Sequence, residues 1–185
     1  RFNKRSEKVL SHAKGLSFLF KKIEPLARTR RSPNKKLMVK QELENTFAIF
    51  SSELDAGDIS FEILVEEGEL AINANEIDLI TVFSNLIENS IFWLGNNQSK
   101  ERKIKAHMFK DNEQLIIEYT DTGPGFQGGN LELMFEPGYS MKPEGTGLGL
   151  ALAGEAMSRI GGRIEAKQVD DGAMFEVVFE GYLSD

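Results

Sequence analysis

The stretch FEPGYSMKPEGTGLGLAL, residues 135–152, decides the fold of this chain, because a glycine-rich loop in it runs directly into an apolar helix pattern. The loop contains Gly145, Thr146, Gly147, Leu148 and Gly149. Glycines at a helix start leave backbone N–H groups accessible at the positively polarised terminus, where phosphate groups bind. The stretch therefore predicts a phosphate-binding loop in front of a helix over residues 148–160. It matches neither a dinucleotide-binding fingerprint nor a P-loop.

A second glycine-containing segment, DTGPG at residues 121–125, directly follows a predicted strand. Gly123 and Gly125 allow the backbone to turn sharply and to approach a ligand, and the Asp121 carboxylate can accept a hydrogen bond from an exocyclic amine. The same residues are typical of a tight turn after a strand, so a purely structural role is the alternative interpretation.

A third segment is a long helix predicted over residues 75–94, where apolar residues recur every three or four positions. Asn85 and Asn89 lie four residues apart in it, so both amides project from one face. Amide oxygens are hard, neutral ligands that suit Mg²⁺, which keeps several waters and shares the phosphates of its nucleotide. A pair of solvated surface asparagines is the alternative.

In chain order, the asparagines Asn85 and Asn89, the segment 121–125, Phe135 and the glycines at 145–149 occur in the order and approximate spacing of the sequence boxes of sensor histidine kinases. Over residues 37–180 the chain resembles the ATP-binding catalytic domain of these kinases, within the superfamily that also holds gyrase-type ATPases. The resemblance implies the Bergerat fold, with ATP and Mg²⁺ as cofactors. The implied reaction transfers the ATP γ-phosphoryl group to a histidine outside this chain, for relay to a response regulator.

The resemblance also implies a role for each matching residue. Asn89 would bind Mg²⁺, Asn85 would support the metal or the phosphates, and Asp121 would bind the adenine amino group. Lys142 would close on the γ-phosphate from a mobile lid over residues 136–146, with an exposed loop lysine as the alternative. The implied nucleotide-binding residues are Asn85, Asn89, Trp93, Asp121, Gly123, Gly125, Lys142, Gly145, Thr146, Gly147, Leu148 and Gly149. Phe135 would pack beneath the lid.

Three positions depart from the family pattern. The family commonly has a basic residue three positions after the second asparagine, where this chain has Phe92, so one phosphate contact is missing. Trp93 stands where an aromatic residue often lies beside adenine, although it could equally anchor the core. Ala173 replaces a small hydroxyl residue near the adenine site. These departures bear on the rate and affinity of a kinase more than on nucleotide binding itself.

Two other functions stay open. A stand-alone ATPase of the superfamily uses a glutamate to activate water, but an amide stands at that position in Asn85, which leaves Glu88 as the acidic candidate for a catalytic base. A non-catalytic nucleotide-sensing module would fit the missing basic residue. Rapid release of inorganic phosphate without a histidine substrate would favour the ATPase.

The remaining patterns predict an α+β fold. Strands are predicted over residues 37–39, 59–65, 104–109, 115–119, 163–169 and 173–179, and a further helix over residues 41–54. Helices interspersed with strands that can pair as hairpins favour a two-layer α/β sandwich with a mixed sheet over a doubly wound parallel sheet. A long amphipathic helix over residues 2–30 precedes this body, and the breaker Ser32-Pro33-Asn34 predicts a domain boundary.

The resemblance divides the chain at that boundary. Residues 1–33 would be the second helix of a dimerisation and phosphoacceptor hairpin plus its linker, and residues 34–185 the catalytic domain. The full-length protein would then be a homodimer, with the phosphorylated histidine on a preceding helix of its own or the partner subunit. His12 is followed by Ala13 and Lys14 instead of an acidic residue, so neither it nor His107 is expected to be the acceptor.

Composition and charge limit the function classes. The 185 residues contain no cysteine, which excludes disulfides, thiolate metal sites and a cysteine nucleophile. Residues 1–40 hold 13 of the 22 lysines and arginines against two acids, a formal charge of +11, which leaves −18 for the remainder. We interpret the basic residues as a helix that docks on an acidic body or partner, not as a nucleic-acid site. Because the chain starts at Arg1 without a methionine, we expect a fragment of a cytoplasmic protein or the cytoplasmic part of a membrane-anchored sensor.

Overall fold

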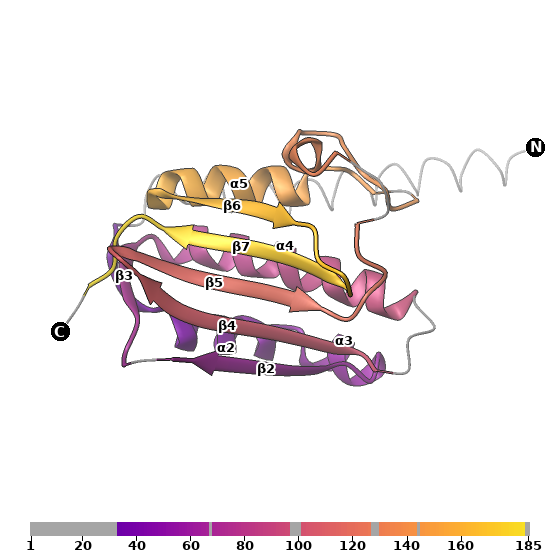
Figure 1. Cartoon of the computed structure of the whole chain (residues 1–185), viewed down its shortest axis with the longest axis horizontal. Helices are drawn as coiled ribbons and strands as arrows, with labels where there is room; N and C mark the ends of the chain where they lie inside the picture. The colour runs from indigo at the N-terminus through magenta and orange to yellow at the C-terminus, as the bar shows by residue number, and fades with distance from the viewer. Residues whose placement is uncertain (1–32, 67, 97–100, 127–129, 144, 184–185) are drawn as a thin grey trace, which may run out of the picture. The chain divides into compact units, whose positions relative to one another are not determined.

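The computed structural model describes residues 33–183 apart from residues 67, 97–100, 127–129 and 144 (Figure 1). The helix predicted over residues 2–30, its linker up to Ser32 and His12 lie outside the described residues. Residues 34–185 form one compact unit. This unit is an α+β fold, as the sequence predicts.

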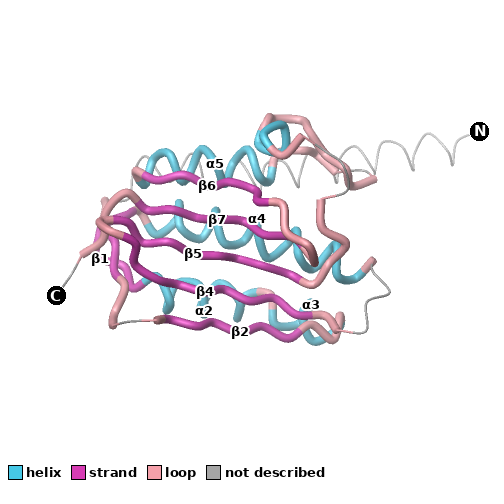
Figure 2. Tube along the Cα trace, in the orientation of Figure 1, coloured by secondary structure: helices cyan, strands magenta, loops and turns pink. Residues whose placement is uncertain are grey.

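A five-stranded mixed sheet forms one layer of this unit. Its strands stand in the order β2-β4-β5-β7-β6; β2 runs parallel to β4, and all other neighbours are antiparallel. Their bounds are Ser60–Val65 for β2, Lys103–Asp111 for β4, Gln114–Asp121 for β5, Gly162–Lys167 for β6 and Ala173–Phe179 for β7. A separate two-stranded antiparallel sheet pairs β1, Lys35–Met38, with β3, Ala71–Ala74, at the end of the unit that lies left in Figure 2.

The helices form the second layer, on one face of the main sheet (Figure 1). They are α2 at Val39–Ile49, α3 at Ser51–Ala56, α4 at Glu76–Gly95 and α5 at Gly149–Ile160, with a 3₁₀ turn η1 at Glu132–Phe135. The central helix α4 packs against both α2 and α5. Alternate residues of the sheet, such as Ile104, Ala106 and Met108 in β4, are fully buried in the core. The two-layer sandwich follows because each element has only one apolar face to bury.

Helix α4 positions most of the residues of interest, and its start is defined locally. The Asn75 side chain caps it by accepting a hydrogen bond from the backbone N–H of Ile77 at 2.9 Å. Glu76 and Asp78 in the first turn complement the helix dipole. The helix is long and apolar enough to cross a membrane by length and composition. Half of that window is buried inside the fold, as expected for a core helix.

One helix prediction is wrong. The segment 41–54 forms two helices, because Phe50 leaves the helical conformation (φ −99°, ψ 12°) and its N–H bonds to the carbonyl of Phe47 at 3.0 Å. The next residues, Ser51 and Ser52, are poor helix-interior residues, since a serine hydroxyl competes for backbone hydrogen bonds. The new helix α3 buries Leu54 in the core.

Strand predictions differ from the structure at the ends. The strand predicted over residues 37–39 is β1 at Lys35–Met38, since Val39 already begins α2, and the strand predicted over residues 163–169 is β6 at Gly162–Lys167. Strand β3 has no counterpart in the predictions. Four residues are too short to show an alternation, and β3 is defined by its pairing with β1.

Candidate functional site

Two consecutive residues of α4 connect it to two segments that are distant in the sequence. The Ser90 side chain contacts Asp121 at the end of β5, and the Asn89 side chain contacts Lys142, 53 residues later. Helix α4 is therefore in contact both with the start of the segment 121–125 and with the stretch that precedes α5.

At the first of these contacts, a buried hydrogen-bond chain fixes Asp121. The Tyr119 hydroxyl donates to Ser90 Oγ at 3.2 Å, and Ser90 Oγ donates to Asp121 Oδ2 at 2.6 Å. The other oxygen, Asp121 Oδ1, accepts from the backbone N–H of Gly123 at 3.0 Å. Ser90 and Tyr119 are inaccessible to solvent or nearly so, and Asp121 is 6% exposed. The carboxylate is thus held in one orientation at the surface of the core.

The environment of Asp121 shifts its proton affinity. Burial raises the pKa of the Asp121 carboxyl, and hydrogen bonds from Ser90, Gly123 and Ala173 oppose that rise because they favour the ionised form. Burial also raises the pKa of the Tyr119 phenol far above its usual range, so Tyr119 stays a neutral donor. A buried carboxylate with polar neighbours is the kind of group that recognises a hydrogen-bond donor of a ligand.

The segment after Asp121 approaches α4 closely. A Cβ at Gly123 would lie 3.6 Å from Trp93 Cβ, so Trp93 borders the same place as the carboxylate. Gly125 has φ +68°, and a Cβ there would come within 2.6 Å of the carbonyl oxygen of Gly172. Only glycine fits this left-handed position without displacing the adjacent backbone.

At the second contact, the two asparagines of α4 differ. Asn85 is buried, and its Nδ2 donates to the carbonyl of Thr81 one turn earlier at 2.7 Å. Asn89 is partly exposed, and its Oδ1 accepts from the Lys142 ammonium at 2.6 Å. Lys142 Nζ also lies 4.7 Å from the centre of the Phe92 ring. The lysine predicted to act on phosphates therefore lies against α4 beside one of the predicted metal-binding amides.

Backbone hydrogen bonds connect residues of the predicted lid, 136–146, to one another and to Gly147. The N–H of Gly138 donates to the carbonyl of Gly147 at 2.9 Å, and the N–H of Gly145 donates to the carbonyl of Lys142 at 3.0 Å. Gly147 has φ +66°, and a Cβ there would lie 2.3 Å from the carbonyl carbon of Gly138. A larger residue at this position would therefore force the backbone at Gly138 and at Gly147 apart.

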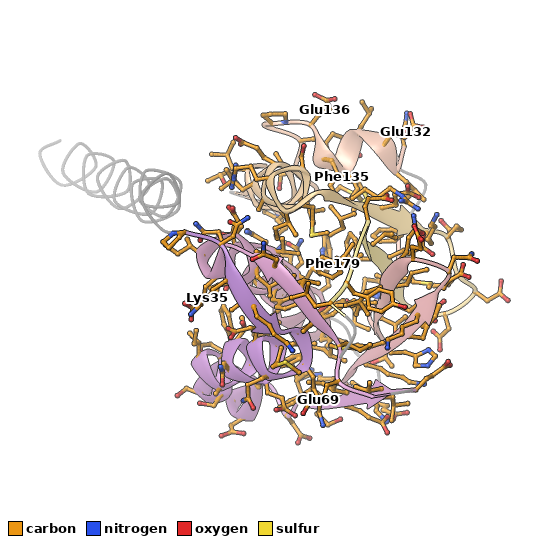
Figure 3. The ribbon with its side chains drawn as sticks, turned by 90° about the vertical axis from the view of Figure 1, so that its left-hand side faces the viewer. Lys35, Glu69, Glu132, Phe135, Glu136 and Phe179 are labelled. Atoms are coloured by element: carbon orange, nitrogen blue, oxygen red, sulfur yellow. The ribbon has the colours of Figure 1, made fainter. Side chains whose placement is uncertain are left out.

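Phe135 lies at the base of this lid. It is partly buried, packs against the core cluster and contacts α5 near Gly154, where an added Cβ would meet its ring at 3.7 Å. Figure 3 shows Phe135 with Glu132 and Glu136 at the lid end of the molecule, while Phe179 lies in the interior. This position agrees with packing beneath the lid.

The start of α5 adds free backbone donors to the same region. Leu148 is its N-cap and Gly149 its first residue, and no side chain caps the helix. The N–H of Leu148 has a long contact, 3.4 Å, with Thr146 Oγ1. A helix start without a side-chain cap leaves N–H groups available to an anion.

Two other titratable residues considered in the sequence are Glu88 and His107. Glu88 is a partly exposed residue of α4, and its role as a base stays a prediction. His107 is on β4, where its neighbours Ala106 and Met108 face the helices, so its own ring faces the opposite side. There its Nε2 lies 2.9 Å from Glu66 Oε1. His107 therefore cannot receive a group from a ligand bound beside α4.

Ser90 is the residue that sequence reasoning missed. Its only signal is a small polar residue on the buried side of an otherwise apolar helix stripe, between Leu86 and Leu94, which are both fully buried. A buried hydroxyl needs a partner, so this position indicates a tertiary hydrogen bond, but the pattern does not name Asp121 as that partner.

The donor set fits Mg²⁺. The positively charged Lys142 ammonium already contacts Asn89 Oδ1 at 2.6 Å, which shows that this oxygen faces a place where a cation can approach. In the part of the chain that the structure describes, no group of three or more His, Cys, Asp or Glu side chains could hold a metal. An ion held by an amide and by the phosphates of a nucleotide would need no such group.

Comparison with known proteins agrees with this geometry. Residues 74–181 match the family described as histidine kinase-, DNA gyrase B-, and HSP90-like ATPase. The chain is 37% identical over 100 residues to the sensor protein CitS of Bacillus subtilis, which covers 54% of this chain and 18% of that protein. It is 28% identical over 136 residues to the sensor histidine kinase ZraS of Salmonella typhimurium, covering 73% of this chain and 29% of that protein. The chain thus spans less than a third of the length of these relatives.

Solved structures share the fold. The mycobacterial sensor histidine kinase MprB superposes with a TM-score of 0.68 at 20% identity, over 79% of this chain and 96% of that one. Histidine kinase ThkA, solved in complex with the response regulator protein TrrA, superposes with a TM-score of 0.70 at 17% identity, over 90% of this chain and 48% of that one. From the match over residues 74–181, the chain belongs to the histidine kinase-, DNA gyrase B- and HSP90-like ATPase family.

Proposed function

We propose that this chain is the catalytic part of a sensor histidine kinase that transfers the ATP γ-phosphoryl group to a histidine outside residues 1–185. The observation that carries the proposal is the pair of contacts made by Asn89 and Ser90. One connects α4 to the lid lysine and the other to the buried carboxylate of Asp121. The part of the proposed nucleotide site beside Asn89 and Lys142 would hold the phosphates, and the part beside Asp121 would hold the base.

At the base end, Asp121 would accept a hydrogen bond from the adenine amino group, with Trp93, Gly123 and Gly125 beside the base. The support is the fixed orientation of its carboxylate and the closeness of Gly123 to Trp93. A buried acceptor of this kind rejects a base that lacks the matching donor, because the acceptor would then stay unpaired. We therefore expect selectivity for adenine over guanine.

At the phosphate end, Asn89 would hold Mg²⁺ with support from Asn85, and Lys142 and the loop from Gly145 to Gly149 would contact the phosphates. When bound, Mg²⁺ would neutralise phosphate charge and orient the γ-phosphoryl group. The chain's own contribution is positioning: phosphoryl transfer needs reactants held in line and developing charge offset, not a covalent partner from the protein. The Lys142 ammonium and the uncapped start of α5 provide that charge.

Attack by a histidine is better supported than attack by water. Asn85 is an amide whose Nδ2 bonds to its own helix, and an amide cannot take a proton from water. A neutral imidazole is itself a nucleophile and needs no base of this kind. The acceptor histidine would belong to a preceding helix of the same or a partner subunit in a homodimer. The second substrate would be the receiver domain of a response regulator, and the domain would work in the cytoplasm.

The test uses the natural full-length protein that contains this chain. Incubation with γ-labelled ATP and Mg²⁺ should label the protein with phosphate that is lost in acid and kept in alkali, which is the behaviour of phosphohistidine. The variant Asn89→Ala should abolish labelling. Rapid release of labelled inorganic phosphate without labelled protein would instead identify an ATPase. ATP binding with neither product would identify a nucleotide sensor.

A further inference from the structure

Helix α4 carries no lysine or arginine between Glu76 and Gly95, although it borders the site proposed for a triphosphate. A polyanion bound there needs positive charge, which this helix cannot supply from its own side chains. The charge instead reaches the helix from the lid, where Lys142 is partly buried against α4. A lysine side chain is flexible, so contacts are needed to keep its ammonium group beside the helix.

The Lys142 ammonium contacts two groups on one face of α4. One is Asn89 Oδ1 at 2.6 Å and the other is the ring of Phe92, whose centre lies 4.7 Å from Nζ. Residues three apart on a helix are neighbours, so the ring lies about one turn from the amide. An ammonium within about 6 Å of a ring centre is attracted by the negative face of the π-system. The ring of Trp93 meets that of Phe92 edge-on, at 5.0 Å and 89°.

We propose that Phe92 is a positioning residue that holds the Lys142 ammonium at the triphosphate end of the site through a cation–π contact. The inference rests on the proposed ATP site and adds the element that supplies its positive charge. These two contacts of the ammonium, with Asn89 and with Phe92, are not equivalent. A metal ion and the ammonium compete for the same Oδ1 of Asn89, whereas a phenyl ring is not a metal ligand. The ring therefore keeps the ammonium near the phosphates when the amide is occupied.

A double-mutant cycle tests this contact by calorimetry, with MgATP and adenosine as the two probes. The variant Phe92→Leu keeps an apolar side chain but removes the π-system, and it should weaken MgATP binding by about fivefold while leaving adenosine binding unchanged. Lys142→Met should weaken MgATP binding at least as much. In the Lys142→Met background, Phe92→Leu should have no further effect, because the cation that the ring attracts is gone.

Two further variants separate the contact from general effects on the fold. Phe92→Tyr keeps an aromatic face and should bind MgATP like the wild type. Phe61→Leu makes the same exchange on β2, at a ring that stacks on Phe47 in the core, and should leave MgATP binding unchanged. Additive losses in the cycle, or Phe92→Leu with wild-type affinity, would overturn the inference while the ATP site stands. A wild-type protein that does not bind MgATP would overturn both.

Discussion

Removal of the Ser90 hydroxyl should affect the fold and base recognition together. In Ser90→Ala, the Asp121 carboxylate loses a donor at 2.6 Å and the Tyr119 hydroxyl loses its acceptor at 3.2 Å, with both groups buried. A hydrogen bond to a charged group contributes about 1.5–3 kcal/mol and a neutral one about 1 kcal/mol. Alanine regains about 0.5 kcal/mol of helix propensity. The net loss of unfolding free energy should be about 2–3.5 kcal/mol.

Urea unfolding followed by circular dichroism measures this loss. At a slope of about 2 kcal/mol per molar urea, the unfolding midpoint should fall by about 1–2 M with the slope unchanged. The matched control is Ser84→Ala, a partly exposed serine on the same helix, which should keep the wild-type midpoint within about 0.3 M or raise it. Tyr119→Phe should lose about 1 kcal/mol, and its loss should not add fully to that of Ser90→Ala, because the two groups share one hydrogen bond.

Adenosine binding to the same variants tests the functional half of the argument. Without the Ser90 hydroxyl, the Asp121 carboxylate is no longer fixed, so adenosine should bind about tenfold more weakly in Ser90→Ala than in Ser84→Ala. Equal unfolding midpoints and equal adenosine affinities for these two variants would refute the role of the hydrogen-bond chain. A loss of stability with unchanged adenosine binding would leave Ser90 a purely structural residue.

Three further predictions concern the remaining parts of the site. Asn89→Ala should weaken Mg²⁺-dependent ATP binding at least tenfold and adenosine binding little; equal losses in calorimetry would count against a metal role. Burial raises the pKa of Asp121 above its ordinary value near 3.8. Adenosine affinity should therefore fall as the pH drops from 7 toward this raised pKa, because protonation removes the hydrogen-bond acceptor. Asp121→Asn, which binds adenosine more weakly, should lack this pH dependence, and a wild-type affinity that stays flat from pH 7 down to 3.8 would contradict it. Gly147→Ala should disrupt the lid and weaken ATP binding about tenfold, because its Cβ would meet Gly138; Gly181→Ala, with open space around it, should bind normally, and equal affinities of the two would reject the argument.

Local patterns in the sequence predicted the elements whose information is local. Helices α4 and α5 follow from apolar residues at every third or fourth position, and strand β4 follows from alternating apolar residues. The segments that bear Asn89, Asp121 and Gly147 also stood out, because amides, a carboxylate after a strand and alternating glycines each have a recognisable chemistry. In the structure, Asp121 and Lys142 both contact α4, although they are far from it in the sequence.

Only the tertiary structure decided features that depend on residues far apart in the chain. Strand β3 exists through its pairing with β1, and the break at Phe50 lets α3 bury Leu54. The partners of Ser90 and of Phe92 lie 31 and 50 positions further on, at Asp121 and Lys142. A periodic pattern shows which side of a helix is buried or polar, but it does not name the residue that meets that side. That choice is made by packing, which brings distant groups within the few ångströms at which hydrogen bonds and cation–π contacts act.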